Sequence, residues 1–288
     1  IFLWISRFFF IWFINKGITD PLEPITFPYL VAQRIVFLLT NVLGPMKQAY
    51  LNMPVISTFV LFMGAGYIIG GIRSCLIVGS LFLFIALSEY WDRTLITLYM
   101  ATFAVGVSAF SGIIVGSLCS QNDFASKTIL SICDFFQTFP SFIYLIPVIL
   151  LFGITDTSVM IAAIVYASVP ATRYTVEGLR SVPTSLHDAG SMSGVSKIQR
   201  WRLIDIPLAL PHIMLGINQT VIFALMMIVL GALIGTEDLG QLIMGSLSRP
   251  NGAGIGFTLG IFISFICLAV DNLIRTWADE RKKLLGIQ

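Results

Sequence analysis

Long apolar stretches recur along most of this chain, and they limit its possible folds more than any other feature. A helix needs about 20 apolar residues to cross the hydrocarbon core of a bilayer. Seven stretches of roughly this kind, separated by polar segments, lie at residues 54–70, 72–87, 94–119, 128–152, 158–172, 208–234 and 256–270. They predict an all-α fold, a polytopic bundle of about seven membrane-spanning helices.

The overall composition excludes a soluble enzyme. Hydrophobic residues make up 57% of the chain and charged residues only 11%, whereas a soluble domain carries about 25% charged residues. The net charge of +2 is too small to indicate a nucleic-acid partner, so lipid is the surrounding that we expect. The cysteines lack metal-binding spacing and are predicted to be buried apolar residues: Cys75, Cys119, Cys133 and Cys267.

The first part of the chain, residues 1–53, differs from the rest. Ile1 begins within an apolar run, so we expect the numbered chain to be part of a longer protein. Residues 1–14 predict either a partial span or an interfacial anchor, and Arg7 in their middle leaves both open. Residues 29–42 have apolar side chains at helical spacing, which predicts a helix along the membrane surface.

Basic residues give the expected orientation of the bundle. They concentrate before the span at 208–234 and after the span at 256–270, and such residues favour the cytoplasmic side. Two spans lie between these regions, so both can be cytoplasmic, as would be the C-terminus. By the same count, the loops at 155–157 and 235–253 lie outside, and the polar patch at 120–127 lies inside.

One polar loop, residues 181–207, is longer than the others and lies on the positive side. Ser185 followed by Asp188 predicts an N-cap and capping box for a short helix, and Gly194 predicts its end. Pro207 suits the start of the next span. These residues leave two interpretations open. The loop is either a projecting docking element for a soluble partner, or a solvated loop whose basic residues contact lipid headgroups.

The same loop resembles the signature of ATP-binding-cassette importer permeases. That signature reads Glu-Ala-Ala, three residues, Gly, nine residues, then Ile-x-Leu-Pro. This chain has Asp188-Ala-Gly, three residues, Gly194, nine residues, then Ile204-Asp-Ile-Pro207. The spacing is kept throughout, and the departures are Asp188 for Glu, Gly190 for the second Ala and Ile206 for Leu.

Three further segments resemble the glycine betaine and proline betaine permeases within that family. They are the run at 134–147, which contains Gln-Thr-Phe-Pro and Tyr-Leu-Ile-Pro, the start of the span at 208–220, and the Gly-Thr-Glu-Asp-Leu-Gly string at 235–240. The likeness covers about residues 94–275 and extends loosely from residue 54. It divides the chain into an N-terminal segment (1–53), two accessory helices (54–93) and a core permease domain (94–288) with its coupling loop at 181–207.

The resemblance implies a type I importer permease in a bacterial cytoplasmic (inner) membrane. Two permease copies, here a homodimer, would form the pathway, and a periplasmic or extracellular substrate-binding protein would deliver a compatible solute: glycine betaine, proline betaine, choline or a related methylated amine such as trimethylamine N-oxide. Each coupling loop would sit in a groove on an ATPase subunit. The residues implied in that coupling are Ser185, His187, Asp188, Ala189, Gly190, Gly194, Ile204 and Pro207.

ATP hydrolysis is expected on a partner chain. The sequence has no Gly-x-x-x-x-Gly-Lys-Ser/Thr phosphate loop, so ATP and magnesium would bind the ATPase subunit and this chain would carry no cofactor. The Gly-rich run at 64–71 lies inside a hydrophobic span, where small residues serve close helix packing. We therefore predict no catalytic or metal-binding residue.

Polar residues within the spans are candidates for the translocation path, because unpaired polar groups are costly in lipid. The alternative role for each is an inter-helix hydrogen bond. Aromatic residues are concentrated around residues 135–144, and packing explains their presence there more simply than a binding site does. The candidate path residues are Gln137, Thr138, Pro140, Asn218, Gln219 and Thr220.

Two other classes of function remain to be weighed. An ion-coupled carrier or channel would need no ATPase but would need an ionisable residue near mid-membrane, and Asp134 is the strongest candidate. A membrane-bound enzyme would need a cluster of His, Cys or carboxylate residues at one depth, and the sequence shows none.

Overall fold

The structure, a computed structural model, describes residues 27–285, and every regular element in that part of the chain is helical. The predicted all-α class is therefore confirmed, while the prediction for residues 1–14 lies outside the described residues. The helices are α2 (Phe27–Leu51), α3 (Val55–Ala86), α4 (Trp91–Cys119), α5 (Asp123–Thr138), η1 (Ser141–Tyr144), α6 (Leu145–Phe152), α7 (Asp156–Arg180), α8 (Thr184–Met192), α9 (Lys197–Arg200), η2 (Trp201–Asp205), α10 (Ile206–Leu230), η3 (Gly231–Ile234), α11 (Leu239–Leu247) and α12 (Ala253–Leu285).

The described helices include fewer membrane-length spans than the seven that the sequence predicts. Five are long and apolar enough to cross a bilayer, and a sixth is formed if the bent pair of α5 with the segment after it counts as one span. The five are Val55–Ala86, Trp91–Cys119, Asp156–Arg180, Lys197–Ile234 and Ala253–Arg281. The difference from seven arises in α3 and in α5.

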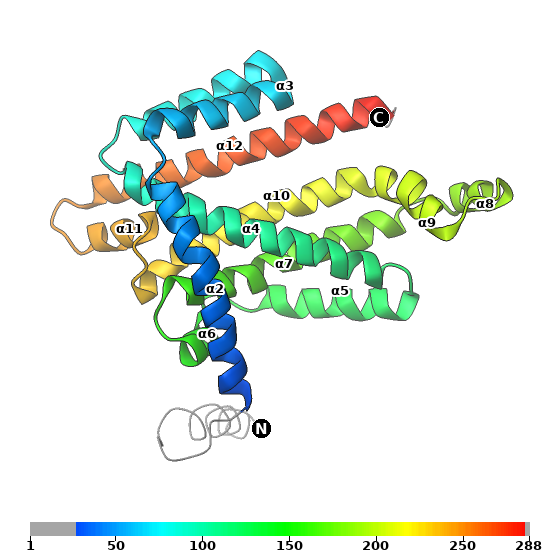
Figure 1. Cartoon of the computed structure of the whole chain (residues 1–288), viewed down its shortest axis with the longest axis horizontal. Helices are drawn as coiled ribbons and strands as arrows, with labels where there is room; N and C mark the ends of the chain where they lie inside the picture. The colour runs from blue at the N-terminus through cyan, green and yellow to red at the C-terminus, as the bar shows by residue number, and fades with distance from the viewer. Residues whose placement is uncertain (1–26, 286–288) are drawn as a thin grey trace.

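Helix α3 is a hairpin rather than a straight rod. Gly71 has φ 66° and ψ −158°, a conformation that glycine adopts without the penalty of a Cβ. The chain reverses there, so the rings of Phe62 and Phe82 stack with centroids 4.1 Å apart, as Figure 1 shows for the two arms. The apolar stretches 54–70 and 72–87 thus form two antiparallel arms, each about 23 Å long and shorter than the hydrocarbon core.

The span at 128–152, in which Pro140 and Pro147 predict an interruption, is bent and not continuous. Helix α5 ends at Thr138, and the segment after it, Ser141–Ile149, is bent from it by 104°. The cause is Pro140, which disfavours helical geometry at the residue before it; Phe139 accordingly has an extended backbone. The polar patch at 120–127 is also mostly helical, because the Asn122 side chain caps α5 by accepting a hydrogen bond from the Phe124 N–H at 2.8 Å.

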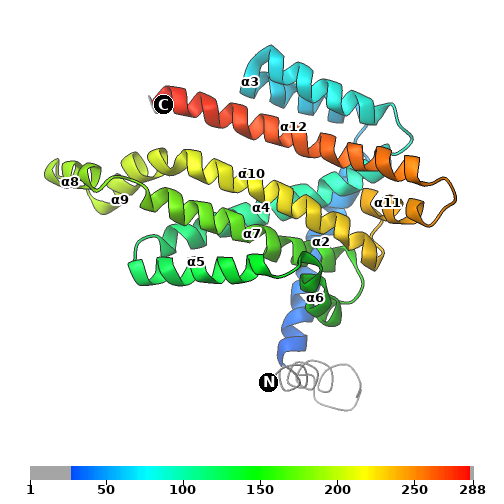
Figure 2. The ribbon, with the colours of Figure 1, turned by 180° about the vertical axis from the view of Figure 1, so that it is seen from behind.

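Helix α7 is central to the bundle, packed between α4 and α10 (Figures 1 and 2). Small residues permit this close approach: Gly112 and Gly116 of α4 lie directly against Ala171 and Thr175 of α7. A Cβ at Gly112 would be 2.5 Å from the Cβ of Ala171. Close contact through small side chains is the usual means of holding membrane helices together.

Helix α2 crosses the bundle at a steep angle to the long helices, as both ribbon views show. It contacts α4, α6 and α7. Lys47 pairs with Asp156 at the start of α7 at 2.8 Å, and the Tyr50 hydroxyl donates to Thr102 of α4 at 3.1 Å. The helix predicted at 29–42 is therefore present and longer than expected; its position along a membrane surface stays a prediction.

The predicted loop at 235–253 contains a further helix, α11. Gly235 adopts a left-handed φ of 90° after η3. The Asp238 carboxylate then caps α11 by accepting from the Gln241 N–H at 3.1 Å, and burial raises the pKa of Asp238 to about 6. The expectation of a plain loop is wrong because this cap starts a short helix that packs against α12.

Candidate functional site

The loop at 181–207 forms a short projecting helix. Helix α8 lies beyond the ends of α7 and α10 at one end of the bundle in both views (Figures 1 and 2). Helix α7 leads into it through the turn at 181–183, and α9 leads out of it towards α10. His187 and Ala189 lie within α8. The polar loop thus presents a compact helix away from the bundle, as a docking element requires.

The start of α8 differs from the predicted capping box. The helix begins at Thr184, and the Leu186 N–H donates to the Pro183 carbonyl at 3.1 Å. Ser185 therefore lies within the first turn instead of before it, and Asp188 lies past the first turn and is exposed. The box was wrong because Pro183 already supplies the turn that begins the helix.

A complete capping box does occur further along the same loop. The Gln199 N–H donates to the Ser196 hydroxyl at 3.3 Å, and the Ser196 N–H donates to the Gln199 side chain at 2.9 Å. Sequence reasoning missed it, although Ser-x-x-Gln is a recognisable pattern. This box fixes the start of the helix that returns to the membrane.

Gly194 ends α8, as predicted. It has φ +73°, and the Val195 N–H donates to the Gly190 carbonyl at 3.2 Å. This is the bonding pattern of a Schellman cap, in which a left-handed residue lets the chain satisfy an otherwise unpaired helix carbonyl. The glycine of the signature is thus the residue that turns the chain after α8.

The two ends of the signature touch each other. Gly190 is buried, and a Cβ at this position would lie 3.1 Å from Cδ1 of Ile204. Ile204 lies in η2, a short π-helical segment that runs directly into α10, where Pro207 is near the start. A small residue at 190 therefore lets α8 fold back onto the helix that enters the membrane.

A charged cluster joins α5 to α7. Arg173 of α7 binds the Asp134 carboxylate at 2.6 Å and the Glu177 carboxylate at 3.0 Å, and it donates to the Gln137 side chain at 3.4 Å. All of these side chains are partly or largely exposed in the single chain. Asp134, the candidate for an ion-coupled carrier, therefore has a basic partner.

The candidate path residues fall into two different surroundings. Gln137, Thr138 and Pro140 are exposed at the end of α5. Asn218 is buried and its amide donates to the Asp271 carboxylate of α12 at 2.6 Å. The contact of Asn218 is thus the inter-helix hydrogen bond that the sequence left as its alternative role.

The two polar residues that follow Asn218 in α10 are at least partly buried. Thr220 is buried and its hydroxyl donates to the Gly216 carbonyl at 2.9 Å, while Gln219 is half-buried. Asp271 also receives a hydrogen bond from Arg275 at 2.7 Å. Sequence reasoning missed Asp271, although a carboxylate in an otherwise apolar helix is a usable signal.

Aromatic rings gather near the break at Pro140. Phe135 and Phe139 meet at 4.8 Å in an edge-to-face arrangement, and Phe136 stacks with Tyr144 across the bend at 6.1 Å. The Tyr144 hydroxyl also donates to the Phe136 carbonyl. The predicted aromatic cluster is therefore present, and part of it, Phe135 and Phe139, is exposed.

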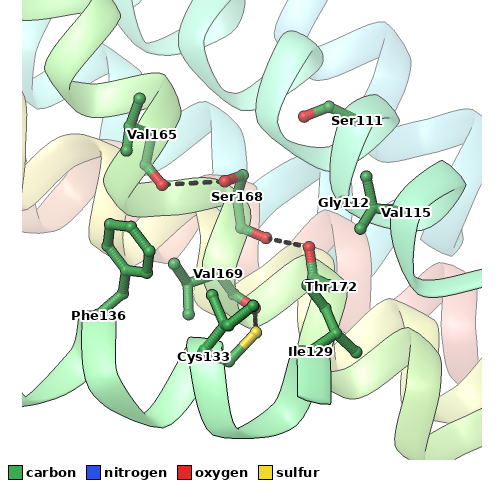
Figure 3. A pocket seen from close by; sticks show the side chains of 11 residues that line it. Ser111, Gly112, Val115, Ile129, Cys133, Phe136, Val165, Ser168, Val169 and Thr172 are labelled. Atoms are coloured by element: carbon green, nitrogen blue, oxygen red, sulfur yellow. Dashed lines mark hydrogen bonds between the residues drawn. The ribbon is translucent and has the colours of Figure 1, made fainter. Parts of the chain in front are cut away.

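A cavity of about 260 Å³ lies between α4, α5 and α7. Figure 3 shows that its polar side chains turn towards helix carbonyls: Ser168 to Val165, Thr172 to Ser168 and Cys133 to Val169. The space itself is bordered mainly by apolar atoms and offers no charged group. It suits packing or lipid better than a polar solute.

Comparison with known proteins agrees with this geometry. Residues 108–283 match the family described as "Binding-protein-dependent transport system inner membrane component". The chain is 59% identical over 275 residues to the trimethylamine N-oxide transport system permease protein TmoV of Pelagibacter ubique, and 40% identical over 247 residues to TmoV of Ruegeria pomeroyi. These alignments cover 96% and 85% of this chain but only 38% and 37% of the two relatives.

A third relative, the glycine betaine transport system permease protein OpuAB of Bacillus subtilis, is 32% identical over 70% of this chain and 71% of its own length. The helical bundle with its projecting loop is thus of the importer-permease class. The chain belongs to the family of binding-protein-dependent transport system inner membrane components. The likeness to glycine betaine-type permeases, predicted from the sequence, is confirmed.

Proposed function

We propose that this chain is the permease subunit of an ATP-binding-cassette importer for compatible solutes, with small zwitterionic methylated amines as its cargo. Trimethylamine N-oxide is the first candidate, because two relatives are named for its transport. Glycine betaine is the second, because more distant relatives are named for it. The chain would supply the membrane path and no catalysis of its own.

The observation that carries this proposal is the geometry of α8. It projects from the bundle, its C-terminal turn is fixed by Gly194, and Gly190 holds it against Ile204. A helix held in this way behaves as one body with α10, so a force applied to α8 reaches the membrane part. Asp188 is an exposed acidic residue of α8, so we assign it to a partner contact.

The other components of the importer follow from the proposed class of protein. An ATPase subunit binds MgATP and receives α8, a second permease copy completes the path, and a soluble binding protein delivers cargo to the opposite face. The C-terminus after α12 lies on the cytoplasmic side with α8, because basic residues concentrate in both places.

A reconstitution experiment tests the proposal. The full-length permease, its ATPase and its binding protein are placed in proteoliposomes, and uptake of labelled trimethylamine N-oxide and glycine betaine is measured. We expect uptake that requires both ATP and the binding protein. Uptake driven by an ion gradient without ATP would instead establish the carrier alternative.

A charge reversal tests the role of α8 within that system. Asp188→Lys should weaken co-purification of the ATPase and reduce uptake, because it reverses the charge and enlarges the side chain at an exposed position of the proposed docking helix. Glu280→Lys, at an exposed site on α12 away from the loop, is the matched control. Equal behaviour of the two variants would contradict the docking role of α8.

A further inference from the structure

One face of α5 is polar along most of its length. Lys127, Ser131, Asp134 and Thr138 recur every three or four residues, so they lie on one side of the helix, and all of them are exposed. Helix α5 is at the edge of the bundle in both ribbon views (Figures 1 and 2). Charged side chains facing lipid are costly, so this face borders water rather than acyl chains.

The charged cluster on this face contains a cationic and an anionic side chain in contact with each other. Arg173 reaches from α7 to Asp134 of α5 at 2.6 Å, and the two side chains keep 35% and 60% of their surface exposed. Gln137 lies in contact with the same guanidinium. Because a second ion pair, Asp123 with Arg180, also joins α5 to α7, the first pair is not the sole electrostatic link between these helices.

We propose that Arg173, Asp134 and Gln137 form a transit site for a zwitterionic methylated amine, an inference that rests on the proposed function. Such a solute carries a cationic ammonium and an anionic oxygen in one small molecule. Arg173 donates to the oxygen, and Asp134 faces the ammonium. The exposed rings of Phe135 and Phe139, on the same helix, offer faces that attract a methylated cation.

The charges balance in this exchange. When the solute enters, the pair between Arg173 and Asp134 opens and is replaced by one pair with each end of the solute. When the solute leaves, the internal pair closes again, so each charge has a partner before and after transit. A cation alone would pair with Asp134 and gain nothing from Arg173, which would keep its contact with Glu177. A zwitterion gains a contact with each of Asp134 and Arg173, so the site prefers zwitterions to choline.

Weak binding to the assembled importer is the direct test. The permease with its ATPase is placed in lipid nanodiscs, and saturation-transfer NMR follows the methyl signals of trimethylamine N-oxide, glycine betaine and choline at millimolar concentration. We expect transfer to both zwitterions and little to choline. Arg173→Gln should weaken zwitterion binding roughly tenfold, the value of about one charge-assisted hydrogen bond, and reduce the preference over choline.

Two double variants distinguish recognition of the solute from a purely structural link between α5 and α7. The double variant Asp134→Asn with Arg173→Gln removes both charges of this pair at once. It also removes the cation next to Glu177, but that side chain is 40% exposed and can be solvated, so the variant is expected to fold. The matched control, Asp123→Asn with Arg180→Gln, removes the other pair between the same helices. Only the first double variant should lose the saturation transfer; equal transfer in both, or equal loss in both, overturns the transit site.

Failure of this inference is distinguishable from failure of the proposed function. If the unmodified importer shows ATP-dependent uptake and Arg173→Gln binds the zwitterions as well as the unmodified protein does, the transit site is wrong and the permease function stands. If the unmodified protein shows no ATP-dependent uptake of any methylated amine, the proposed function is wrong and the transit site falls with it.

Discussion

Replacing Gly194 tests how far the shape of α8 controls coupling. The glycine has φ +73°, and an added Cβ would meet no heavy atom within 4 Å. A substitution here therefore changes the backbone preference without creating a clash. A series of Gly194→Asn, Gly194→Ala and Gly194→Val grades this effect, because Asn tolerates left-handed geometry, Ala does so at a cost and a β-branched residue hardly does.

The size of the effect follows from that geometry. An L-residue with a Cβ costs about 1–2 kcal/mol more than glycine in the left-handed region. Every 1.4 kcal/mol is about tenfold in an equilibrium, so Gly194→Ala should raise the population of an opened α8 terminus roughly tenfold. Asn should raise it less, and Val more.

Two measurements report the population of the opened α8 terminus. Hydrogen exchange at the Val195 amide, which donates to Gly190 in the closed cap, should quicken in the order Gly, Asn, Ala, Val. The ratio of solute taken up to ATP hydrolysed should fall in the same order. The control is Gly106→Ala in α4, where a new Cβ also meets nothing within 4 Å. It should leave the exchange rate of the Val195 amide and the uptake ratio unchanged.

The result that would refute the reasoning is specific. If Gly194→Val exchanges its Val195 amide as slowly as the unmodified protein, the left-handed turn does not limit the cap. If exchange quickens in the expected order while the uptake ratio stays constant, the cap forms as described but does not transmit force to the membrane.

Three other substitutions probe packing, pH and burial. Gly112→Ala should destabilise the protein by about 1–3 kcal/mol, because its Cβ would lie 2.5 Å from that of Ala171; thermal unfolding measures this, with Gly106→Ala in the same helix as the open-space control. Burial raises the pKa of Asp238 from 3.8 to about 6, so the stability that this carboxyl group contributes should be fully present below the lower value and be lost as pH rises through about 6. Asp238→Asn keeps a capping side chain but cannot ionise, so it should flatten the dependence of the unfolding free energy on pH. An unchanged slope of unfolding free energy against pH in this variant would contradict the assignment to Asp238. Asn218→Ala should cost roughly 1–3 kcal/mol by leaving the partly buried Asp271 carboxylate of α12 short of one donor, with uptake per folded molecule unchanged; a fall in uptake per folded molecule would assign Asn218 to the path.

Local chemistry in the sequence predicted the parts of the fold that depend on neighbouring residues. The apolar stretches gave the helices, and Gly194 gave the end of α8, because only glycine adopts its φ readily. The spacing from Asp188 to Pro207 identified the loop, and the family match confirms the class. These features are encoded within a few turns of helix, where sequence distance and spatial distance are nearly the same.

Features that depend on tertiary contact could not be predicted in this way. The turn at Gly71 could be recognised as a break, but the direction of the second arm follows from packing such as that of Phe62 on Phe82. Pro140 signalled an interruption without giving its bend of 104°. Arg173 was only one of the basic residues before the span at 208–234 that indicate orientation. Its partner on α5 is 39 residues away in the chain, so no local pattern links the two.

The distribution of contacts indicates where a force on α8 would be taken up. Helix α7 packs extensively against both α10 and α4 through small residues, and α7 and α10 enter and leave the α8 loop, so these helices should move together. The junction between α5 and α7 is less extensive and includes two exposed ion pairs, Arg173 with Asp134 and Arg180 with Asp123. Exposed pairs contribute only about 0–1 kcal/mol each. If α8 moves together with α7 and α10, the α5–α7 junction is one of the less extensive contacts of α7 at which relative movement is expected. It is also where a transit site would have to open.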